Sequence, residues 1–299
     1  MKKTLDQELK SPQLDDQPSK KSFSTGTPQP EVIGLRNQVN QTVKNFQLYR
    51  DIVQAVPAAA QEKMGEMLIG YTEAAESARD LDPLITVPPN SVFLEHIHSL
   101  PLKMLLKIAN FGKPTILVVP NNSFQEKIDN MNKFKPYSDP STKAKQQNIN
   151  LDLGWDSPYE LHERLAKNTI SITDGQAHMP DIDGIDPDTS WWDLRDAFQA
   201  YFKQKGLRLI NVPEGAALMH QSMRNYANNG QDISKIVDYI SPENATMSCF
   251  SRSHLLNSSG EVAYFCFSSG NRQISFNSDG PSHRSALLKG RPVLELFSY

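Results

Sequence analysis

The feature that most constrains the fold is a continuous apolar run, Thr115-Ile116-Leu117-Val118-Val119. A run of this length is typical of a strand buried on both faces, and such strands are commonest in parallel sheets. Segments 169–173 and 207–212 also have strand-like patterns, and segments with helical spacing lie between them. We therefore expect an α/β fold with a mostly parallel central sheet flanked by helices, a helical N-terminal segment and an antiparallel C-terminal extension.

Composition predicts how the rest of the chain is organised. Residues 1–30 are rich in Lys, Gln, Ser, Pro and Asp, which predicts a disordered polar tail. Residues 31–299 are expected to form a single α/β domain. Within it we expect a helical hairpin at 31–80, an α/β core at 90–240 and an antiparallel β extension at 245–299. Apolar spacing typical of helices supports the first part, and short strands between Gly, Ser and Asn turns support the last.

Charge and hydropathy bear on the possible partners and compartment. The formal net charge is -3, so no global basic field attracts nucleic acid or an anionic membrane. No apolar run approaches the roughly 18 residues of a membrane span. Met1-Lys2-Lys3 is basic but no apolar segment follows, and Cys249 and Cys266 are too few for a disulfide framework. We expect a cytoplasmic protein, or one that is secreted without a cleaved signal peptide. Its partner would be a small-molecule substrate or another protein.

The segment from Asn168 to Leu194 is unusually acidic. It contains six aspartates and one histidine, His178, and no lysine or arginine. Carboxylates packed this densely repel one another unless they are solvated, spread along helix starts or neutralised by a cation. Asp181, Asp183 and Asp186 have the density of an oxygen-ligand cation site, for which Mg²⁺ or Ca²⁺ would be the ion. The alternative is a solvated loop whose last acidic residues favour the following helix start.

Polar turns follow each of the three expected strands. They contain Asn121, Asn122 and Ser123 after the first, Asp174 after the second and Glu214 after the third. In open parallel sheets, ligands bind beyond the carboxyl ends of the strands. If the strands are parallel neighbours, the turns converge, and Asn121, Asn122, Ser123 and Glu214 would bind a substrate. The alternative is that these are ordinary turn residues, chosen for backbone conformation.

Two functions remain open at this point. Asp174 lies four residues before His178, and a carboxylate close to an imidazole can act as acid and base. The first hypothesis is therefore an enzyme for metal-assisted hydrolysis or group transfer on a phosphate- or sugar-containing substrate. The second is a non-catalytic binding or effector protein that engages a partner through its N-terminal tail and helices. No P-loop, G-x-G-x-x-G, G-x-S-x-G or H-E-x-x-H motif decides between them.

Overall fold

The computed structural model describes residues 30–133, 152–155, 165–175, 186, 189–229, 246–250, 261–268, 273–280, 282 and 288–299. The chain divides into two units, Met1–Gln41 and Thr42–Tyr299. In the first unit the described residues, 30–41, are helical and belong to α1 (Pro30–Gln54). The tail predicted for residues 1–30 lies outside the described residues, apart from Pro30.

The second unit begins with a layer of helices, which comprises the end of α1, α2 (Ala58–Ile69), α3 (Tyr71–Leu81), α4 (Asn90–His98) and α5 (Leu102–Ala109). Pro57, Pro89 and Pro101 stand immediately before α2, α4 and α5. Proline suits a helix start because the first amide groups of a helix have no intrahelical acceptor. Apolar side chains of this layer, Met64 and Phe93 among them, form a core cluster with side chains of the central sheet.

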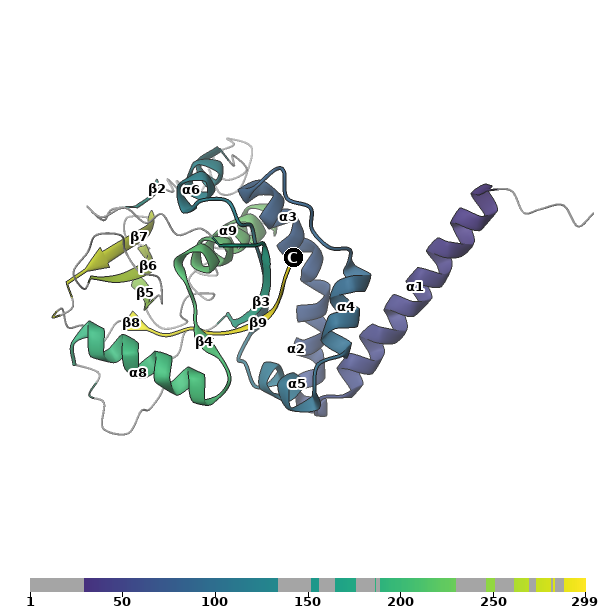
Figure 1. Cartoon of the computed structure of the whole chain (residues 1–299), viewed down its shortest axis with the longest axis horizontal. Helices are drawn as coiled ribbons and strands as arrows, with labels where there is room; N and C mark the ends of the chain where they lie inside the picture. The colour runs from purple at the N-terminus through teal and green to yellow at the C-terminus, as the bar shows by residue number, and fades with distance from the viewer. Residues whose placement is uncertain are drawn as a thin grey trace, which may run out of the picture. The chain divides into compact units, whose positions relative to one another are not determined.

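The central sheet contains β1 (Pro114–Val119), β3 (Thr169–Asp174), β9 (Pro292–Ser298) and β4 (Arg208–Leu209), in that order. Every neighbouring pair is antiparallel. Pro114 pairs with Asp174 and Val119 with Thr169, so the end of β1 lies beside the start of β3. Helices α2–α5 lie on one side of this sheet and α9 (Val212–Asn229) on the other (Figure 1).

A second sheet has the strand order β2 (Asp152–Trp155), β7 (Gln273–Asp279), β6 (Val262–Ser268), β5 (Thr246–Phe250) and β8 (Leu288–Lys289). Its three inner strands are antiparallel, and the short edge strands β2 and β8 pair in parallel with β7 and β5. Between β1 and β2 lies α6 (Phe124–Lys133). Helix α8 (Trp191–Gln204) packs Trp191, Phe198 and Phe202 against Leu209 and Val262.

The predicted mostly parallel central sheet is wrong, because the central sheet is antiparallel throughout. All six residues of β1 and of β3 are buried, as the apolar run indicated, but helices on both faces of an antiparallel sheet produce this burial. The strand expected at 207–212 is confined to Arg208 and Leu209, since Val212 already begins α9. β9, which was expected in a C-terminal extension, lies inside the central sheet.

Candidate functional site

Asp174 is the last residue of β3, and its carboxylate fixes the segment before β1. The amide of Gly112 donates to Oδ2 at 2.8 Å and that of Lys113 donates to Oδ1 at 2.9 Å. The buried Arg291 donates from Nη1 to the carbonyl of Asp174 at 2.8 Å. Residues 110–113, which we call the strap, are therefore tied to the end of β3.

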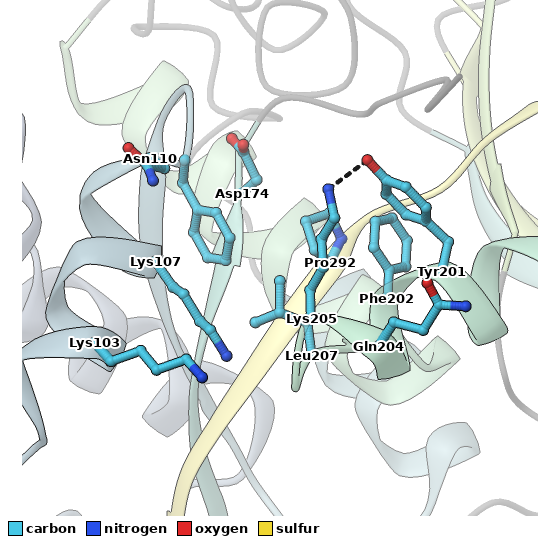
Figure 2. Close-up of a pocket in the computed structure, with 11 residues that line it drawn as sticks. Lys103, Lys107, Asn110, Asp174, Tyr201, Phe202, Gln204, Lys205, Leu207 and Pro292 are labelled. Carbon is cyan, nitrogen blue, oxygen red and sulfur yellow. Dashed lines mark hydrogen bonds between the residues drawn. The ribbon is translucent and has the colours of Figure 1, made fainter. Parts of the chain in front are cut away.

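Beside Asp174 lies a pocket of about 480 Å³, which we call the lysine pocket. It is formed by α5, the strap, the end of α8 with the residues that follow it, and the ends of β3 and β9 (Figure 2). Its lining residues are Lys103, Lys107, Asn110, Phe111, Asp174, Tyr201, Phe202, Gln204, Lys205, Leu207 and Pro292. The pocket thus combines an apolar and aromatic wall with amino groups.

Three lysines and one carboxylate line this pocket, so its local charge is positive although the whole chain is acidic. Lys103 and Lys107 are four residues apart on α5, which places them on the same face of the helix. Neither forms a hydrogen bond or ion pair with any residue that the structure describes. Lys205 is different, because its ammonium lies 3.9 Å from the centre of the Tyr201 ring and also binds the Tyr201 hydroxyl.

Gly206 lies where the residues after α8 approach Lys107 of α5. It follows the end of α8 with φ of 65°, a left-handed conformation that glycine adopts without strain. A Cβ atom at position 206 would lie 2.9 Å from Nζ of Lys107. The ammonium of Lys107 therefore lies at the C-terminus of α8, where the helix dipole favours a positive charge.

The predicted substrate-binding residues after β1 lie at the other end of the strand pair from Asp174. The pairing is antiparallel over six residues, which separates the two ends by roughly 17 Å at about 3.4 Å per residue. Nδ2 of Asn122 donates to the carbonyl of Leu81 at 2.9 Å, and the amide of Asn121 donates to Oδ1 of Asn168 at 2.9 Å. Ser123 accepts a hydrogen bond from the amide of Glu126 at the start of α6. The structure therefore does not bring these residues together with Asp174.

Glu214 is fully buried in the first turn of α9. Its Oε2 lies 2.6 Å from Nη1 of Arg208 and its Oε1 lies 2.5 Å from Nη2. Ser171 donates to Oε1 at 3.2 Å, and the amide of Asn211 donates to Oε2 at 3.0 Å. Burial lowers the pKa of Arg208, but hydrogen bonds and attraction from Glu214 and Glu295 outweigh it and the net shift is upward.

The acidic segment is described only in part. His178, Asp181 and Asp183 lie outside the described residues, so their predicted roles stay predictions. Asp186 is exposed, and its carbonyl accepts a hydrogen bond from the amide of Thr189 at 2.9 Å. Ser190 caps α8 by accepting a hydrogen bond from the amide of Asp193.

A buried imidazole joins α9 to α3. Nε2 of His220 lies 3.1 Å from Oδ2 of Asp80, and Nε of Arg224 donates to the same oxygen at 2.7 Å. Burial lowers the pKa of His220, although the hydrogen bond and charge of Asp80 oppose the shift. His220 does not line the lysine pocket. We assign this cluster to the packing of the two helices.

No family model, curated protein or solved structure matches this chain. None of the helices in the described ranges combines the length and the apolar character needed to cross a membrane. The same residues contain no group of three or more His, Cys, Asp or Glu side chains placed to hold a metal ion.

Proposed function

We propose that this protein binds a small anionic molecule with a flat apolar part, and that the lysine pocket is its site. The observation that carries the proposal is the pair Lys103 and Lys107, which share one face of α5 and line the pocket. Neither forms an ion pair with a described residue, although Asp174 also lines the pocket. Ammonium groups without a carboxylate partner favour an anion.

The wall of the lysine pocket supports the second half of the proposal. Phe111, Phe202, Leu207 and Pro292 supply apolar surface beside the amino groups. A volume of about 480 Å³ lies within the range of ordinary small-molecule sites, and such sites combine apolar walls with a few charged groups. A ring that carries a phosphate fits this combination, whereas the enzyme hypothesis from the sequence named a phosphate- or sugar-containing substrate.

The test uses 4-nitrophenyl phosphate, a ring with one phosphate group, and measures its binding by calorimetry. The double variant Lys103→Gln/Lys107→Gln removes both ammonium groups, and hydrogen bonds to charged groups contribute about 1.5–3 kcal/mol each. We expect the affinity to fall by roughly a hundredfold or more. The control is Lys133→Gln/Lys203→Gln, which removes the same number of charges at two lysines that do not line the pocket. This control should bind the compound as tightly as the parent does. Equal affinity in the two double variants would reject the site.

The same compound separates binding from catalysis, because its hydrolysis releases the coloured 4-nitrophenolate. The enzyme hypothesis, with Asp174, His178 and a Mg²⁺ or Ca²⁺ ion, requires release that depends on the ion and is abolished by EDTA. We propose binding without turnover, because both oxygens of Asp174 accept backbone hydrogen bonds from the strap. Ion-dependent release that is lost in His178→Ala would favour the enzyme instead.

A further inference from the structure

A second and smaller pocket lies where the start of β3 meets β4, the start of α9 and β9. We call it the Arg208 pocket, and its volume is about 180 Å³. The lining residues include Thr169, Arg208, Asn211 and Glu295, with the exposed Lys167 among them. It shares no lining residue with the lysine pocket, so a ligand of the Arg208 pocket would not depend on the function proposed for the lysine pocket.

The guanidinium of Arg208 is only partly bound. A guanidinium presents its donors in a fixed fork, so a carboxylate can bind either the two terminal nitrogens or the side edge formed by Nε and one terminal nitrogen. Glu214 takes both terminal nitrogens. On the side edge, Glu295 accepts from Nη2 at 3.1 Å, while Nε is buried with no hydrogen-bond partner among the described residues.

Two other residues that line the Arg208 pocket also have a buried polar atom without a hydrogen-bond partner among the described residues. Nδ2 of Asn211 and Oγ1 of Thr169 are buried without a partner in the described part of the chain, and the two residues are 1% and 7% exposed. Oδ1 of Asn211 is used, since it accepts from the amide of Glu214 at 2.8 Å. A buried donor left without an acceptor costs about 1–3 kcal/mol. Three such atoms around one pocket indicate a missing acceptor.

We propose that the Arg208 pocket binds a small carboxylate, which takes the side edge of Arg208 in place of Glu295 and accepts hydrogen bonds from Asn211 and Thr169. Glu295 itself shows that this edge accepts a carboxylate, and its side chain, 43% exposed, is free to turn into solvent. When the ligand replaces Glu295, the side edge of Arg208 still binds one carboxylate, so the charge beside the guanidinium does not change. A phosphate dianion would add charge beside Glu214.

The volume limits the size of the ligand. The Arg208 pocket's volume of about 180 Å³ compares with about 480 Å³ for the lysine pocket, so the space suits a carboxylate with a short carbon chain. The two sites would therefore take ligands of different size.

The experiment measures the melting midpoint of the full chain with sodium acetate, acetamide or phosphate at constant ionic strength. Acetate should raise the midpoint saturably, by a few degrees well above its Kd, because it binds only the folded state. Thr169→Val removes a hydroxyl that has no partner among the described residues and keeps the shape, so it should fold normally and reduce the response. Glu295→Gln weakens the competing contact of an exposed residue and should lower the acetate Kd several-fold.

The remaining outcomes are decisive. Lys103→Gln/Lys107→Gln should leave the acetate response unchanged. If this variant loses the response while Thr169→Val keeps it, acetate binds in the lysine pocket and the proposal is overturned. A flat midpoint would mean that the Arg208 pocket does not bind acetate. An equal effect of acetamide would mean that the response does not depend on the carboxylate charge, and either result would overturn the proposal. A stronger response to phosphate than to acetate would contradict the carboxylate class.

Discussion

Asp174 accepts the amides of Gly112 and Lys113 and so fixes the wall of the lysine pocket with a single side chain. Asn211 and Glu214 do the same for α9, because each accepts the other's amide in a capping box. At the residue scale, these buried polar side chains therefore position backbone. Lys103, Lys107 and Nε of Arg208, by contrast, have no hydrogen-bond partner among the described residues and line the two pockets.

Asp174→Asn is the first test at this scale. An amide offers one oxygen, and its NH₂ group would face one of the two backbone N–H donors that the carboxylate now accepts. We expect the free energy of unfolding to fall by about 1–3 kcal/mol, measured by urea denaturation. Asp186→Asn, at an exposed position, should change it by no more than about 0.5 kcal/mol. Equal stability of the two variants would show that the strap is held in another way.

His220 makes stability depend on pH. Because burial lowers its pKa in the folded state, the unfolded chain takes up a proton first as the pH falls below about 6.5. The folded state is then progressively destabilised until the pH reaches the lowered pKa. His220→Gln keeps a donor for Asp80 but does not titrate. The stability advantage of the parent over this variant should therefore shrink between pH 7.5 and 5, and a constant gap in urea midpoint would contradict the assignment.

At the element scale, the sequence predicted strand positions better than strand pairing. The apolar runs at 115–119 and 169–173 correspond to β1 and β3, because burial on both faces leaves a local mark. The direction of strand pairing has no such local signal. Helices cover both faces of this antiparallel sheet, so its strands have the same apolar pattern as the strands of a parallel sheet. β9 was assigned to an extension because its partner β3 lies more than a hundred residues earlier.

The difference between local patterns and long-range contacts also explains which residues of the lysine pocket could be predicted from the sequence. Asp174 was predicted to be at a functional strand end, and it does line the lysine pocket. Lys103 and Lys107 were overlooked, although their i, i+4 spacing on an otherwise apolar helix was the available signal. Their juxtaposition with Tyr201 and Lys205 joins segments about a hundred residues apart, which no local pattern contains.

Gly206→Ala tests the junction between α8 and α5. A left-handed conformation costs a residue with a Cβ atom roughly 1–2 kcal/mol, and the new methyl group would displace the ammonium of Lys107. We expect lower stability together with weaker binding of 4-nitrophenyl phosphate. Gly280→Ala is the control, because a Cβ atom there meets no atom within 4 Å. Unchanged stability of Gly206→Ala would contradict the junction described here.

At the scale of the whole molecule, the central sheet depends on β9. This strand pairs with β3 on one side and β4 on the other, and it contributes Leu294 to the core cluster shared with the helix layer. Deletion of residues 292–299 should therefore abolish cooperative unfolding, as followed by circular dichroism during heating. Deletion of residues 1–29 is the comparison, because that segment has few apolar side chains and its loss should leave the midpoint nearly unchanged. A cooperative transition in the 292–299 deletion would refute the dependence.

The place of β9 also has a consequence for biosynthesis. A ribosome makes β1, β3 and β4 long before it makes the strand that belongs between β3 and β4. During that interval the nascent chain carries apolar strands with open edges, which are prone to pair with other chains. Completion of the sheet must wait for the last residues of the described chain. We expect the yield of native protein in cell-free translation to depend on chaperones that shield the chain during this interval.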